Sequence, residues 1–74
     1  MTAAELASRL GDMYRTAPKG EMVAMIHLFG IRHADEIRDC GTSPTDLAKA
    51  AGIPETYGVE VNKGINLAKY VCER

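Results

Sequence analysis

Side chains that can bind a polar ligand gather between residues 49 and 69. This segment holds three lysines, two asparagines, a threonine and a tyrosine besides its carboxylates. Asparagine can form two hydrogen bonds with the edge of adenine, and lysine can reach guanine or a phosphate. The chemistry that these residue types favour is contact with nucleic acid. The candidate binding residues are Lys49, Thr56, Tyr57, Asn62, Lys63, Asn66 and Lys69.

The stretch TDLAKAAGIPETYGVEV has the spacing of a helix-turn-helix, which would position these side chains. Ala48 is small enough to let the first helix pack closely on the second. Gly52 follows four residues later and suits the left-handed conformation of a turn. Ile53 is the apolar residue that fills the core at the turn. In such a unit the second helix enters the major groove by its N-terminal residues. Further phosphate contacts are expected from Arg32, Arg38 and Arg74.

Other features oppose a simple DNA-binding interpretation. The net charge is −1, whereas strong DNA binders usually carry a basic excess because phosphate contacts supply most of their affinity. Pro54 stands where Ser or Thr commonly begins the second helix, and Gly58 where an apolar residue is expected, so the turn is one residue longer than usual. Glu55 and Glu60 add negative charge near the end that would meet phosphate. Nucleic-acid contact and a purely protein-binding role therefore remain equal alternatives.

Catalysis is not expected, because no nucleophile motif, Gly-rich phosphate loop or zinc-ligand spacing occurs. His27 lies in the most apolar segment, which favours a histidine that makes a structural hydrogen bond. His33 is expected to be an exposed residue at a helix start. Asp35, Glu36 and Asp39 fit a solvated helix face with local ion pairs. We therefore expect no enzyme, catalytic residue, metal, cofactor or small-molecule substrate.

Helix start and stop signals predict an all-α bundle of four to five short helices. Thr2 and Glu5 form a capping box, and Pro18 ends the first helix. Ser43 as N-cap, Pro44 at the first helical position and Gly52 as stop delimit another. The predicted helices are about 3–16, Met22 to a stop at Gly30, Ile31 to Gly41, Ser43 to Gly52, and Tyr57 to Glu73. The segment from Met22 to Gly30 is apolar all round, so we expect it to be buried on all sides.

The last predicted helix carries a wide apolar face and a narrow polar one. Its core-facing residues would be Tyr57, Val61, Gly64, Ile65, Ala68 and Cys72, with Leu67 and Val71 widening the stripe. Gly58 and Gly64 would allow another helix to approach closely. An apolar face left uncovered would mark a protein interface. The alternative function is therefore a protein-interaction module or a homodimer formed through this helix.

The composition indicates one soluble domain over residues 1–74. A hydrophobic fraction of 46% and a charged fraction of 26% are ordinary for a globular protein. The longest apolar run is far shorter than the roughly 20 residues of a membrane span. The N-terminus does not resemble a signal peptide, so we expect a cytoplasmic protein in which Cys40 and Cys72 are reduced.

The segments MIHLFGIRHADEI and LAKAAGIPETYGVEVNKGINLAKYV together resemble a small bacterial helix-turn-helix-like domain of poorly defined function. Such domains occur alone or beside DNA-modification and restriction modules. The resemblance covers roughly residues 5–72 and rests on packing and turn residues. It implies an all-helical fold and an association with DNA transactions, and it brings no catalytic residues.

Overall fold

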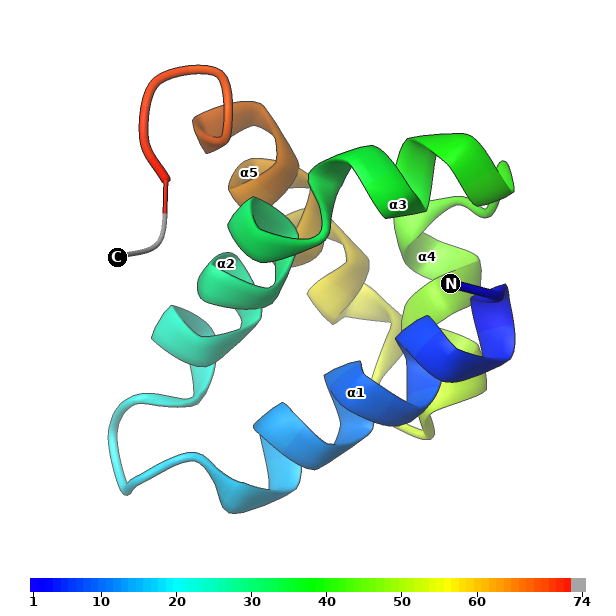
Figure 1. Ribbon diagram of the computed structural model, residues 1–74. Helices are drawn as coiled ribbons and strands as arrows, with labels where there is room; N and C mark the ends of the chain where they lie inside the picture. The colour runs from blue at the N-terminus through cyan, green and yellow to red at the C-terminus, as the bar shows by residue number, and fades with distance from the viewer. Residues whose placement is uncertain (73–74) are drawn as a thin grey trace.

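The computed structural model describes residues 1–72 and contains five α-helices and one 3₁₀ turn (Figure 1). They are α1 (Ala3–Thr16), α2 (Met22–Arg32), α3 (Ala34–Cys40), α4 (Pro44–Ala51), the 3₁₀ turn η1 (Glu55–Tyr57) and α5 (Gly58–Leu67). The predicted all-α class is confirmed. Within the part of the chain that the structure describes, no helix has the length and apolar character needed to span a bilayer.

Helices α1 and α4 begin where the local signals predict. The Thr2 hydroxyl accepts a hydrogen bond from the Glu5 N–H at 3.1 Å, and the Glu5 carboxylate accepts one from the Thr2 N–H at 3.0 Å. Before α4, Ser43 Oγ accepts from the Asp46 N–H at 3.1 Å. Gly52 ends α4 with a φ of 79°, which lies in the left-handed region. These ends are set by neighbouring residues, so the sequence suffices to locate them.

The predicted end of α2 at Gly30 is wrong. The helix continues to Arg32, and His33 both ends α2 and precedes α3. Gly30 is buried where α2 meets α5, and a Cβ there would stand 2.9 Å from Gly64 Cα. Glycine serves here for close backbone approach instead of for a left-handed turn. The expectation that this segment is buried on all sides is also wrong, because Val23 keeps 42% of its surface exposed.

Helix α5 is shorter than the predicted helix from Tyr57 to Glu73. It starts only after η1, and Thr56 makes no capping hydrogen bond. It ends at Leu67 and gives way to a turn at residues 68–70. Cys72 is exposed instead of facing the core, and Glu73 lies outside the described residues.

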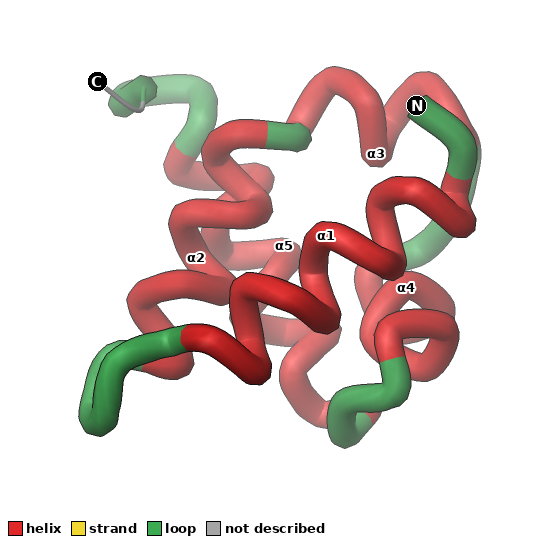
Figure 2. The backbone as a smooth tube through the Cα atoms, turned by 60° about the horizontal axis from the view of Figure 1, so that its bottom comes forward, coloured by secondary structure: helices red, strands yellow, loops and turns green. Residues whose placement is uncertain are grey.

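One core lies between the helices, and α5 is its central element. Figure 2 shows α1 crossing in front of the other helices, with α2 and α5 behind one half and α4 behind the other. The most extensive helix pair is α2 with α5, followed by α1 with α4. The largest fully buried side chains are Phe29, Leu6, Leu10, Ile26, Leu47 and Val61. Because α5 packs on α2, α4 and the end of α3, only its remaining faces can meet a ligand.

Candidate nucleic-acid interface

An open hollow of about 650 Å³ lies where α5 passes α3 and the loop before α4. The nearly buried side chains of Ile37 and Ile65 contribute to its lining. The loop contributes Gly41 and Thr42, and α4 contributes its first residue, Pro44. The polar and charged side chains on the lining are those of Arg38, Thr42, Asn62, Asn66 and Lys69.

Helix α5 presents the two asparagines because Val61 and Ile65 are fixed in the core. Val61 and Ile65 are buried at 0% and 7% exposure, so Asn62 and Asn66, each one residue further on, point outward. The two asparagines are one helical turn apart and therefore share a face. Lys69 follows in the turn after the helix, where its N–H donates to the Asn66 carbonyl at 3.3 Å. Three of the seven predicted binding residues thus line one surface.

The hollow carries positive charge. No Asp or Glu of residues 1–72 lines it, while Arg38 and Lys69 both do. Arg38 Nη1 lies 3.3 Å from Asp35 Oδ1, and the Asp35 side chain is 94% exposed. An exposed pair of this kind contributes only about 0–1 kcal/mol, so a phosphate can replace the carboxylate at little cost. Lys69 forms no ion pair with any residue up to Cys72.

The other four predicted residues do not line this hollow. Lys49 Nζ pairs with Glu55 Oε2 at 3.4 Å. Thr56 is exposed in η1. Tyr57 is half-buried, with its ring packed edge-on against the ring of Tyr14 at a centroid distance of 5.5 Å.

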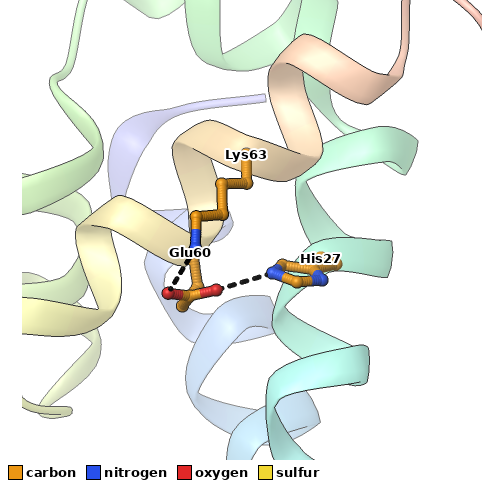
Figure 3. A network of polar contacts seen from close by, with 3 residues as sticks. All are labelled: His27, Glu60 and Lys63. Carbon is orange, nitrogen blue, oxygen red and sulfur yellow. Dashed lines mark hydrogen bonds and ion pairs between the residues drawn. The ribbon is translucent and has the colours of Figure 1, made fainter.

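Lys63, the fourth of these residues, points to the α2 side of α5 (Figure 3). Its Nζ lies 3.3 Å from Glu60 Oε2, and His27 Nε2 lies 2.7 Å from Glu60 Oε1. The hydrogen bond with His27, assisted by Lys63, lowers the pKa of Glu60 below its ordinary value. The negative charge of Glu60 is thus paired with Lys63, away from the hollow. The predicted structural hydrogen bond of His27 is confirmed.

The remaining cations predicted to contact phosphate lie elsewhere. Arg32 lines a separate depression with residues of α1, and Arg74 lies outside the described residues. Sequence reasoning did not anticipate the contribution of the loop at Gly41–Pro44. A glycine that ends α3 and a serine that caps α4 predict a short connection between these helices. They do not predict that α5 packs beside this connection.

His33 is buried instead of exposed, which corrects the prediction. Only 6% of its surface is accessible, and its ring packs on Phe29 at a centroid distance of 5.0 Å. Its Nδ1 lies 2.8 Å from Glu36 Oε1, whereas Nε2 is buried without a hydrogen-bond partner among the described residues. The signal for burial is its helical spacing from Phe29, four residues earlier. His33 is therefore a packing residue of the α2–α3 junction.

Residues 1–72 contain no group of three or more His, Cys, Asp or Glu side chains placed to hold a metal ion. Both cysteines are free thiols, and the Cys40 thiol donates to the Ile37 carbonyl at 3.4 Å. The side chains around the open hollow offer amide groups and cations, which can bind a polar or negatively charged ligand.

Comparison with known families identifies the family of this chain. A family model described as an HTH-like domain matches residues 2–74. The chain belongs to this family. No significant match was found among curated proteins or among solved structures. Residues 52–57 connect α4 and α5. This connection contains η1 and is longer than the 3–4 residues usual between the two helices of a helix-turn-helix.

Proposed function

We propose that this HTH-like domain is a non-enzymatic module that binds duplex DNA through the hollow between α3 and α5. The observation that carries the proposal is the convergence of Arg38, Asn62, Asn66 and Lys69 on one surface that no described carboxylate lines. Membership of an HTH-like family supports the same class of ligand. The two free thiols fit a reducing compartment such as the cytoplasm.

The side chains have different tasks in this proposal. Arg38 and Lys69 contact phosphates, which position the protein without reading sequence. Asn62 and Asn66 lie on the exposed face of α5 and offer amide donors and acceptors to base edges. The rim of the hollow is open, so a sugar-phosphate strand can lie along it. Lys63 stays with Glu60 and contributes little.

Binding is expected to be weak and strongly dependent on salt. The chain carries a net charge of −1, and only two cations line the hollow. Two phosphate contacts imply a loss of affinity of roughly 10-fold between about 50 and 200 mM salt. A larger dependence would require cations that the hollow does not contain.

The first test compares two charge reversals of equal size. Lys69→Glu changes the hollow, whereas Lys19→Glu changes an exposed residue in the loop between α1 and α2. Fluorescence anisotropy with a mixed-sequence duplex at low salt should show binding lost in Lys69→Glu and little changed in Lys19→Glu. Both substitutions alter the net charge equally, so any difference reports the location of the site.

Three results would overturn the proposal. The first is the absence of binding by the unaltered protein at low salt. The second is an equal loss in both variants, which would mean that total charge, and not the hollow, governs association. The third is unchanged binding in Lys69→Glu, which would show that the hollow is not the binding site.

A further inference from the structure

A second surface, on another side of α5, is apolar and exposed. Leu67, Tyr70 and Val71 retain 41%, 83% and 49% of their surface, respectively. Their backbone is nevertheless held in place. The N–H groups of Tyr70 and Val71 both donate to the Leu67 carbonyl, at 2.9 and 3.0 Å. The Tyr70 side chain is therefore exposed to solvent, while hydrogen bonds of the turn hold its backbone in place.

A shallow groove lies directly beside this tyrosine. It has a volume of about 350 Å³ and a mostly apolar lining formed by His27, Lys63, Asn66, Leu67 and Tyr70. The groove therefore combines residues of α2, α5 and the following turn. Val23, which is 42% exposed, stands one helical turn before His27 on α2 and continues the same face.

The projecting ring and the groove belong to the same face of the molecule. A two-fold dimer requires such self-complementarity, because one patch must supply both the projecting and the receiving part. We propose that a second copy of this chain docks here, with Tyr70 of each copy entering the groove of the other. Tyrosine is among the residues that contribute most to binding when buried at the centre of an interface.

The charges around the groove permit two copies to meet. The Lys63 ammonium lies 3.3 Å from the Glu60 carboxylate, so these two charges cancel within each copy. Two copies can therefore meet at this face without strong repulsion between them. The Lys63 ammonium also lies on the groove lining, where the incoming aromatic ring can form a cation–π contact.

The exposed area fits a weak dimer. At 83% exposure Tyr70 presents roughly 200 Å² of surface. Leu67, Val71 and Val23 together add about as much again, so two copies can bury on the order of 800 Å² of mainly apolar surface. This area lies below the roughly 1,200 Å² of the smallest stable specific interfaces and is of the size found for weak, transient contacts. We therefore expect association to be detectable only at high protein concentration.

Sedimentation equilibrium on the full chain tests this proposal. The mass should rise from 8.0 kDa toward twice that value as the concentration increases from about 10 µM to about 1 mM. Tyr70→Ser should keep the mass monomeric throughout, whereas Tyr70→Phe, which retains the ring, should still associate. Val59→Ser is the matched control, since Val59 is 60% exposed but lines a different depression beside Pro44 and Thr45.

A strict monomer at about 1 mM would refute the proposal, as would equal association by the unaltered protein and Tyr70→Ser. Loss of association in Val59→Ser would place the interface elsewhere. Circular dichroism identifies any variant that fails to fold. If a variant fails to fold, the change of NMR chemical shifts with concentration in the unaltered protein replaces it as the test. Changes centred on Val23, His27, Leu67 and Tyr70 support the dimer, and changes centred elsewhere refute it. Tyr70 does not line the hollow, so loss of self-association and loss of DNA binding are separable outcomes.

Discussion

Substitution of Gly64 by alanine should destabilise the protein although it favours helix formation. Gly64 lies in α5 where α2 crosses it, and an added Cβ would stand 2.9 Å from Gly30 Cα and 3.1 Å from the His27 carbonyl carbon. Carbon atoms in contact normally lie about 3.5–4.0 Å apart. The atoms in the way belong to the backbone, so the two helices must separate.

The net effect follows from two opposing terms. Alanine in place of glycine within a helix gains about 0.5–1 kcal/mol. Overpacking a close contact costs about 1–3 kcal/mol, and a clash with backbone belongs at the upper end of that range. We therefore expect a loss of about 2 kcal/mol in the free energy of unfolding, which lowers the melting temperature of a domain this small by about 8–16 °C.

Gly11→Ala is the matched control. It also replaces a glycine inside a helix, but the nearest atoms to the added Cβ are the guanidinium nitrogens of Arg15 at 2.9 Å, whose side chain is exposed and can move. The Ala51 carbonyl oxygen, at 3.0 Å, limits the gain. Thermal and urea unfolding followed by circular dichroism should place Gly11→Ala within about 1 kcal/mol of the unaltered protein. If Gly64→Ala is as stable as Gly11→Ala, the reasoning from close backbone contact is refuted.

Two further predictions concern a helix cap and a titrating carboxylate. Ser43→Ala should lower the free energy of unfolding by about 1 kcal/mol because the Asp46 N–H loses its partner, and Ser43→Asp should restore most of it; equal urea midpoints for all three proteins would contradict this. The pKa of Glu60 is lowered in the folded state by its hydrogen bond with His27 and by Lys63, so its stabilising contribution is present above its ordinary pKa and is lost as the pH falls through the lower folded value. Urea unfolding between about pH 5 and pH 3 should therefore show a smaller decline for Glu60→Gln than for the unaltered protein, and parallel declines would exclude the contribution.

The sequence predicts those helix ends that neighbouring residues determine. Thr2 with Glu5, and Ser43 before Pro44, satisfy backbone groups locally, so α1 and α4 begin as expected. Gly30 looks like a stop in the sequence because glycine ends helices so often. Only the contact with Gly64 reveals that it serves α2–α5 packing, and such a contact joins residues far apart in the chain.

In the candidate site, too, local spacing was predictable from the sequence, whereas contacts between distant residues were not. The spacing of Asn62, Asn66 and Lys69 on one face follows from helical periodicity, and the structure places all three at the hollow. The separation of Lys63 from them depends on Glu60 and on a histidine of α2, which no local pattern links to it. The expected continuous apolar stripe to Cys72 fails because the helix ends at Leu67 and the chain turns.

The glycine contact between α2 and α5 also matters for engineering this domain. At that crossing backbone meets backbone, so the spacing between α2 and α5 does not depend on a long side chain that could adopt another rotamer. Because Val61 and Ile65 also hold α5 in the core, its exposed positions can be randomised while the helix keeps its place. A library at residues 62 and 66 would sample new binding specificities on a scaffold whose geometry these buried residues maintain.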